Sequence, residues 1–137
     1  MRWPFTRFEI AGNSMSPTLL DGDYLLIRRT HDVRPGELVV VDRSPVSAKR
    51  VVAVGNATVD ISGGIVQVDR TTIDDVWPGT TRPDGSWVVG EQSMFLLGDN
   101  RAESTDSREY GAIPTNLIIG RVIVRYWPLR RFSLNRK

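Results

Sequence analysis

The 137-residue chain contains no cysteine and only one histidine, His31. The lack of cysteine excludes a disulfide framework, a thiol nucleophile and cysteine-ligated zinc, and a single histidine excludes a multi-histidine metal centre. Lysine is scarce as well, because 16 of the 18 basic residues are arginine and the two lysines are Lys49 and the terminal Lys137. Any chemistry that needs a lysine inside the chain must therefore use Lys49.

Long apolar runs are also missing. Runs such as Leu38-Val39-Val40-Val41 fall far short of the roughly 20 apolar residues that a membrane-spanning helix needs. Residues 1–7 lack the apolar stretch of a secretory signal peptide. We therefore interpret residues 1–137 as one soluble or peripheral domain, in which residues 1–7 are an N-terminal lead-in and residues 129–137 are a basic tail.

Positive charge is concentrated at the C-terminal end. From Arg121 onward the chain has five arginines, Lys137 and no acidic residue, whereas the preceding 120 residues carry 12 basic and 16 acidic residues. Such an end suits an anionic lipid surface or a nucleic acid, although solvated basic ends are common.

Short segments rich in valine and isoleucine, bounded by turn residues, predict strands along most of the chain. The predicted strands are Tyr24–Arg28, Glu37–Asp42, Ala48–Val54, Thr58–Ile61, Ile65–Asp69, Trp87–Val89, Met94–Leu97 and Leu117–Tyr126. Ser62-Gly63-Gly64 predicts a hairpin between the fourth and fifth of them. The fold class is therefore all-β.

Two further segments differ from this pattern. Ser16–Asp21 is predicted to form a short helical turn, with Ser16 as N-cap and Pro17 at the first helical position. Residues 70–92 are polar and rich in proline, glycine and threonine, and they are predicted to form an excursion from the core or a flexible surface loop.

Residue chemistry alone leaves the choice of a catalytic base open. A serine nucleophile needs an adjacent base, and His31 lies in a predicted turn, where an exposed loop histidine is the simpler interpretation. Lys49 lies in an apolar strand. If it is buried, its pKa falls and the neutral amine becomes a usable base; if it alternates outward, it is an ordinary solvated lysine.

Three stretches stand out in the sequence: Ser14-Met15-Ser16-Pro17-Thr18-Leu19, then Lys49-Arg50-Val51, and then Gly98–Arg108, which is followed by Gly111 and Pro114. They resemble the sequence boxes of the bacterial type I signal peptidase family, which are Ser-Lys endopeptidases of the S26 type. Their order and approximate spacing also match, and the resemblance covers residues 8–128. One box alone would be a weak signal, whereas three in order are specific.

The resemblance implies a catalytic role for two residues and a supporting role for three others. Ser14 would be the nucleophile and Lys49 the general base. Ser104 would hydrogen-bond the lysine amine and orient it. Asp106 and Arg108 would form a buried ion pair that supports the site.

The resemblance also implies roles around the site. Asp99 and Asn100 would shape the turn behind it, and Ile10 and Met15 would line a shallow apolar pocket that accepts small residues. The backbone N–H of Ser14 would stabilise the oxyanion. Many family members supply a second donor from a serine two residues before the nucleophile, but this chain has Gly12 there.

By this resemblance the fold is a set of coiled antiparallel sheets with a small barrel, of the signal peptidase and LexA type. The activity implied is cleavage of signal peptides or propeptides after small residues, of the Ala-x-Ala type, without metal or cofactor. The expected partners are a preprotein or proprotein substrate and an anionic membrane surface, with no nucleic acid. The rate should rise with pH as Lys49 loses its proton.

The chain departs from the family at its start, because family members usually have a membrane span before the serine box and only 13 residues precede Ser14 here. Trp3, Phe5 and Phe8 could instead enter a membrane interface. We therefore expect a spanless or truncated member at the extracytoplasmic face of the bacterial plasma membrane, or alternatively a soluble cytoplasmic one.

Three alternatives follow. The first is a soluble maturation protease of the same family, of the kind that trims the propeptide of nickel superoxide dismutase; the long region between Lys49 and Gly98 favours an ordinary signal peptidase over it. The second is a non-catalytic β-barrel that binds lipid or nucleic acid through its basic tail. The third, a LexA-type self-cleaving domain, is disfavoured because Ala11-Gly12 lies too close to Ser14 to reach it.

Overall fold

The computed structural model describes residues 3–43, 45–73, 84–128 and 133–134, and strands dominate it. The strands are β1 (Phe5–Glu9), β2 (Tyr24–Arg28), β3 (Leu38–Val41), β4 (Ser47–Val54), β5 (Ala57–Ser62), β6 (Ile65–Val68), β7 (Thr71–Thr72), β8 (Gly85–Val89), β9 (Ser93–Leu97), β10 (Ile113–Pro114), β11 (Ile118–Trp127) and β12 (Ser133–Leu134). The helical elements are η1 (Arg101–Glu103), α1 (Ser107–Tyr110) and η2 (Thr115–Leu117). The predicted all-β class is confirmed.

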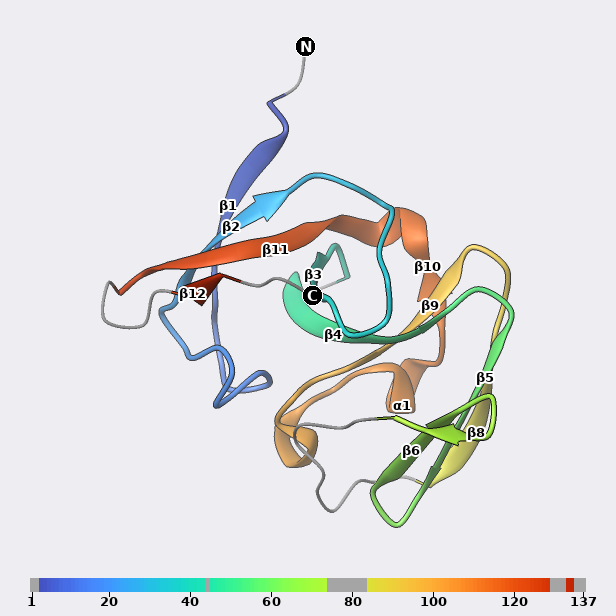
Figure 1. Cartoon of the computed structure of the whole chain (residues 1–137). Coiled ribbons are helices and arrows are strands. Elements are labelled where there is room, and N and C mark those ends of the chain that lie inside the picture. Colours follow the sequence, from blue (N-terminus) through green and yellow to red (C-terminus); the bar gives the residue numbers. More distant parts are fainter. Residues whose placement is uncertain (1–2, 44, 74–83, 129–132, 135–137) are drawn as a thin grey trace.

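The larger of two antiparallel sheets holds β4, which carries the Lys49-Arg50-Val51 box. Its order is β1-β2-β11-β3-β4-β9-β10, and β12 pairs with β11. The sheet curls so that the N-terminal strands, blue in Figure 1, and β9 and β10 lie at opposite ends of the curve. No helix in the described ranges is long and apolar enough to cross a membrane.

The smaller sheet has the order β7-β6-β5-β8 and lies apart from β1 and β2 in Figure 1. The predicted hairpin is confirmed, since β5 and β6 pair antiparallel and their last pair before the turn is Ser62 with Ile65. Gly63 and Gly64 form its turn with φ of +58° and +86°. Backbone with positive φ at two consecutive positions is strained for side-chain-bearing residues, so the glycines are needed here.

Two sequence predictions differ from the structure at the helical segments. Residues 14–18 form successive turns, with Leu19 N–H donating to the Met15 carbonyl at 2.9 Å, and no helix forms at Ser16–Asp21. The α-helix is α1 instead, where the Asp106 carboxylate caps the start by accepting from Arg108 N–H. An Asp N-cap and Gly111 after the last residue are ordinary helix boundaries, and the prediction missed them because the helix is only one turn long.

The structure describes the two ends of the chain to different extents. β1 begins at Phe5, within the segment interpreted as a lead-in. Most of the basic tail at 129–137, including Arg130 and Arg131, lies outside the described residues, as do residues 74–83 of the 70–92 segment.

The apolar core has three clusters, and one of them supports the site. That cluster joins residues from the start of the chain to β2, β3, β4 and β11, and it includes Ile10, Met15, Leu19, Leu25, Ile27, Leu38, Val40, Ala48 and Val122. Met15 and Ala48 are direct chain neighbours of Ser14 and Lys49. The two catalytic boxes are therefore fixed to one another by close packing of their neighbours.

Candidate active site

Lys49 faces inward from the middle of β4. It pairs with Val39 of β3, and only 4% of its surface is exposed. Ser47 lies two residues earlier on the same strand and so on the same face, because side chains alternate along a strand. The structure thus selects the buried interpretation of Lys49 that the sequence left open.

The Ser14 side chain lies against the lysine amine. Ser14 follows β1 in a tight turn, and Lys49 Nζ is 3.2 Å from Ser14 Oγ. The amine has two other hydrogen-bond partners, Ser47 Oγ at 3.3 Å and the Ala48 carbonyl at 3.2 Å. Sequence analysis missed Ser47, although its position two residues before the lysine could have identified it.

The environment of Lys49 favours its neutral form. Burial lowers the pKa of the amine below its ordinary value of 10.5, and the negative charge of Asp106 opposes this shift with a smaller effect. Desolvation penalises an ammonium because it removes the water that stabilises the charge. The arrangement therefore places a deprotonatable amine beside a serine hydroxyl.

Asp106 and Arg108 form the expected buried ion pair. Arg108 Nε donates to Asp106 Oδ1 at 2.8 Å and its NH2 group to Oδ2 at 2.8 Å, and both side chains are nearly inaccessible. The Gly98 N–H donates to the same carboxylate at 2.9 Å. This pair fixes the third box around the start of α1.

Ser104 lies within this network rather than on the lysine. Its hydroxyl donates to Asp106 Oδ2 at 2.8 Å, and the interactions of Ser104 in the described part of the chain do not include the Lys49 amine. In this structure the second serine in contact with Lys49 is Ser47.

Asp99 connects all three boxes. Arg50, which follows Lys49 on β4, donates to both carboxylate oxygens at 2.8 and 2.7 Å. Thr18 of the serine box donates to Asp99 Oδ2 at 2.5 Å, and the Asp99 N–H contacts Met15 Sδ at 3.3 Å. Sequence analysis placed Asp99 in the supporting turn but missed Arg50 and Thr18, which stand inside the matched boxes.

Asn100 holds the turn that carries the nucleophile. Its backbone N–H donates to the Ser14 carbonyl at 2.9 Å, and its side-chain amide donates to the Asn13 carbonyl at 3.0 Å. Among the described residues no acceptor takes the Ser14 N–H, so this donor is free for a ligand oxygen. Gly12 is exposed, with φ of +90° and its N–H bonded to Asp21 Oδ1 at 2.8 Å.

Two depressions meet at Ser14. The smaller one, of about 10 Å³, has the two predicted pocket residues among its lining residues Phe8, Ile10, Ala11, Ser14, Met15, Ser47 and Ala48. The larger cleft, of about 420 Å³, is lined by Ala11, Gly12, Asn13, Ser14, Val41, Arg43, Pro45, Val46, Ser47, Lys49, Glu103, Thr105 and Tyr110.

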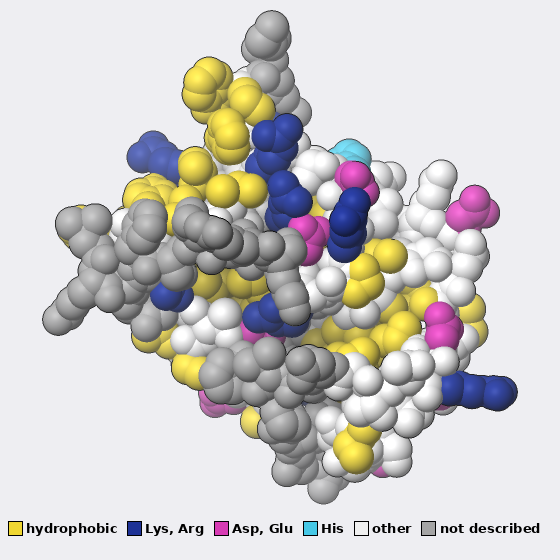
Figure 2. All heavy atoms as spheres, viewed as in Figure 1, with side chains coloured by type: hydrophobic (Ala, Val, Ile, Leu, Met, Phe, Trp, Pro, Cys, Tyr) yellow, Lys and Arg dark blue, Asp and Glu magenta, His cyan; other side chains and the backbone are white. Residues whose placement is uncertain are grey.

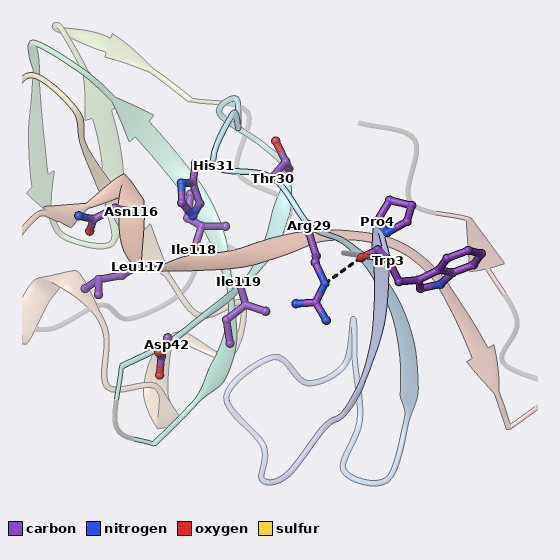
Figure 3. A pocket seen from close by; sticks show the side chains of 10 residues that line it. All are labelled: Trp3, Pro4, Arg29, Thr30, His31, Asp42, Asn116, Leu117, Ile118 and Ile119. Carbon is purple, nitrogen blue, oxygen red and sulfur yellow. Dashed lines mark hydrogen bonds between the residues drawn. The ribbon is translucent and has the colours of Figure 1, made fainter. Parts of the chain in front are cut away.

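His31 is separate from this site. It lines another pocket, of about 540 Å³, with Asn116, Leu117, Ile118 and Ile119, where Arg29 Nε donates to the Trp3 carbonyl at 3.0 Å (Figure 3). Neither Ser14 nor Lys49 lines that pocket. The interpretation of His31 as an exposed loop residue is confirmed.

The comparisons with known proteins agree with this geometry. The family model for signal peptidase, peptidase S26, matches residues 2–127. A signal peptidase I of Leptolyngbya laminosa is 32% identical over 90% of this chain and 70% of its own length. One of Bacillus caldolyticus is 28% identical over 94% of this chain and 83% of its own length.

A solved structure shows that the fold is shared as well. The crystal structure of a signal peptidase I from Enterococcus faecalis V583 superposes with a TM-score of 0.59 at 18% identity, covering 66% of this chain and 96% of that chain. On the family-model match and the sequence relatives, the chain belongs to the signal peptidase family, peptidase S26.

Proposed function

We propose that this protein is a serine endopeptidase that removes N-terminal segments from preproteins, with Ser14 as nucleophile and Lys49 as general base. The observation that carries the proposal is the 3.2 Å contact between the Lys49 amine and Ser14 Oγ at a buried lysine whose pKa is lowered. A neutral amine at that distance can accept the serine proton.

The reaction then proceeds in two halves. Lys49 takes the hydroxyl proton as Ser14 Oγ bonds to the scissile carbonyl carbon, and the oxyanion accepts a hydrogen bond from the Ser14 N–H. The C–N bond breaks as the Lys49 ammonium returns the proton to the leaving nitrogen. Water, deprotonated by Lys49, next attacks the acyl-enzyme, and the ester bond to Ser14 breaks with return of that proton to Oγ. No side chain at Gly12 contributes to the oxyanion site.

The small depression supports cleavage after small residues. About 10 Å³ between Ile10, Met15 and Ala48 leaves room for little more than a methyl group. A pocket of this kind selects by excluding bulk, since each extra methylene changes selectivity by only about 1–3 kcal/mol when it fits. We therefore propose substrates with Ala-x-Ala before the cleaved bond.

A peptide assay tests the proposal. Ser14→Ala and Lys49→Ala should each lose cleavage of an Ala-x-Ala peptide by at least about 10³-fold, because nucleophile and base act as one unit. Ser62→Ala, at an exposed serine in the β5–β6 hairpin, serves as the control and should cleave normally. Unchanged cleavage in both active-site variants would exclude this mechanism.

The natural product distinguishes the substrate classes. Several different preproteins cut after Ala-x-Ala would support an ordinary signal peptidase. One dedicated soluble precursor would support a maturation protease of the same family. Sequencing the new N-termini in cells with and without the enzyme separates the two.

We also propose that the protein works at an anionic membrane surface. Trp3 is 73% exposed and packs edge-on to Phe5, over whose ring the Arg28 guanidinium lies at 5.9 Å. Figure 2 shows hydrophobic side chains beside Lys and Arg side chains at the end of the molecule where β1 begins. Aromatic rings next to cations suit the boundary between lipid headgroups and acyl chains.

A further inference from the structure

The large cleft extends well beyond the space that the residue before the cleaved bond needs. Its volume is about 420 Å³, against about 10 Å³ for the apolar depression on the other side of Ser14. The two share Ala11, Ser14 and Ser47. Of the two, only the large cleft includes Lys49, and only the small depression includes Ile10 and Met15. Each therefore receives a different part of the substrate.

The position of Lys49 indicates which part the large cleft receives. In the proposed reaction the leaving nitrogen takes its proton from the Lys49 amine, so the chain after the cleaved bond must pass that amine. The residue before the bond occupies the depression formed by Ile10 and Met15. The residues that follow the bond consequently lie in the cleft, which has Arg43, Glu103 and Tyr110 on its walls.

Arg43 is an unpaired cation in this cleft. Its guanidinium lies 3.6 Å from the centre of the Tyr110 ring, a stacking distance that limits the directions the side chain can adopt. The part of the chain that the structure describes offers it no carboxylate partner, since the ion pairs there involve Arg50, Arg108, Arg121 and Arg125.

The two neighbouring groups leave that charge available. Burial raises the pKa of Tyr110 to about 12, so the ring faces Arg43 as a neutral phenol at physiological pH. The Glu103 carboxylate accepts from the Asn100 side-chain amide at 3.2 Å and so is held by the loop that braces Ser14.

We propose that Arg43, stacked on Tyr110, forms a subsite for an acidic side chain among the first three residues after the cleaved bond. The inference rests on the proposed proteolytic function and adds a substrate preference on the side that becomes the new N-terminus. An Asp or Glu carboxylate there would pair with the guanidinium, and a Lys or Arg would be repelled by it.

A peptide series tests this subsite. Peptides with one Ala-x-Ala site carry Asp, Asn or Lys at the first, second or third position after it, and kcat/KM is measured for each. At one of these positions Asp should exceed Asn by about two- to fivefold, the size of an exposed ion pair, and Lys should fall below Asn. Because exposed charges are screened by salt, the preference should shrink between low salt and about 0.5 M salt.

Variants assign the preference to Arg43. Arg43→Gln should make the kcat/KM values of the Asp, Asn and Lys peptides equal. Arg34→Gln, at an exposed arginine outside the cleft, should keep the preference. Cleavage with no preference, or a preference that survives Arg43→Gln, would overturn the subsite alone. Failure to cut any peptide would overturn the proteolytic function and the subsite with it.

Discussion

The hydrogen-bond geometry at Lys49 suits the free amine. A neutral amine has two N–H donors and one lone pair, and Nζ has three neighbours, Ser14 Oγ, Ser47 Oγ and the Ala48 carbonyl. A carbonyl can only accept, so one N–H donates to Ala48. If the second donates to Ser47, the lone pair is directed to the Ser14 hydroxyl, which is the orientation that proton transfer needs.

The lowered pKa of Lys49 predicts the pH dependence of activity. In the proposed mechanism the neutral amine is the active form, so kcat/KM should rise about tenfold per pH unit and level off below the ordinary lysine value of 10.5. A rate that does not change between pH 5 and 10 would contradict the lysine-base mechanism.

The same shift has a consequence for stability. The folded state holds the amine at a lower pKa than the unfolded chain, so unfolding binds a proton in the interval between the two pKa values and stability rises with pH there. Lys49→Met should be inactive but should melt at a higher temperature than the unaltered protein at low pH. The difference between the two should narrow as pH rises through that interval.

Ser47 is predicted to position the lysine. Ser47→Ala removes one of the three neighbours of Nζ, so the amine turns away from Ser14 more often. The plateau of kcat at high pH should fall about tenfold, which corresponds to the free energy of one such hydrogen bond. The Ser47 hydroxyl also accepts a hydrogen bond from the ammonium form of Lys49, so its loss should lower the pKa of Lys49 further. The rising part of the pH–rate profile should then move to lower pH. Ser62→Ala is the matched control, and a Ser47→Ala profile that coincides with it would exclude this role.

At the scale of elements, the segment from Gly98 to α1 acts as a brace. It follows β9, which pairs with β4, and it contacts both catalytic boxes through Asp99, bonded to Arg50 and Thr18, and through Asn100, bonded to the Ser14 carbonyl. The buried Asp106–Arg108 pair fixes its far end. Removing one partner of such a pair typically costs about 3–5 kcal/mol, since the other charge stays buried.

Gly98, at the start of this brace, packs closely against Ser14 and Ser104. A Cβ at this position would lie 2.1 Å from Ser104 Oγ and 2.7 Å from the Ser14 carbonyl oxygen, far inside contact distance. Gly98→Ala should therefore lower the free energy of unfolding by at least about 2 kcal/mol and should reduce kcat strongly, because the Ser14 backbone must shift. Denaturant unfolding and the peptide assay measure both effects.

Gly90→Ala is the matched control for this substitution. A Cβ there meets only Ser93 Oγ, at 3.8 Å, which is ordinary contact. It should leave kcat unchanged and stability within about 1 kcal/mol. If Gly98→Ala behaved like Gly90→Ala, the close approach of the brace to Ser14 would be refuted.

For the whole molecule, the local patterns predicted most strands and the β5–β6 hairpin, but they gave no prediction of the other strand pairings. Tyr24–Arg28 has the predicted bounds, because a buried alternating pattern is a local property. β1 was not predicted, since Phe5–Glu9 is a half-exposed edge strand with charged residues in it. The bonds of Asp99 to Arg50 and Thr18 join residues 49 and 81 positions apart in the chain. Their geometry depends on sheet register, which no local pattern encodes.

The candidate site was likewise predicted from the sequence only in part. The three boxes identified Ser14, Lys49, Asp106 and Arg108, which the structure brings together. Alternation along β4 could not decide whether Lys49 faces inward, because strands buried on both faces do not alternate. The structure brings the Ser47 hydroxyl to the Lys49 amine and directs the Ser104 hydroxyl to Asp106. Which of the two serines reaches the amine depends on how the third box packs against β4, and the sequence does not show that packing.

The proposed contact with an anionic membrane can be tested at the exposed aromatic residues of the β1 end. Vesicles with anionic lipid should carry the protein upward in a flotation gradient at low salt, and neutral vesicles should carry much less. Trp3→Ser should weaken flotation because it removes the most exposed aromatic side chain at the β1 end. Val88→Ser, at a residue 78% exposed on the small sheet, is the matched control and should float as the unaltered protein does.

The basic tail is tested in the same gradient. Neutralising Arg130 and Arg131 together, as Arg130→Gln with Arg131→Gln, should reduce partitioning by about 30-fold if each contributes about 1 kcal/mol near an anionic surface. Arg34→Gln with Arg70→Gln removes the same charge elsewhere and should have less effect.

Equal flotation of the tail variant and the unaltered protein would refute a tail anchor. Equal flotation of Trp3→Ser and Val88→Ser would refute the aromatic contact. If flotation is lost in the Trp3 and tail variants while peptide cleavage stays intact, membrane binding and catalysis depend on different residues.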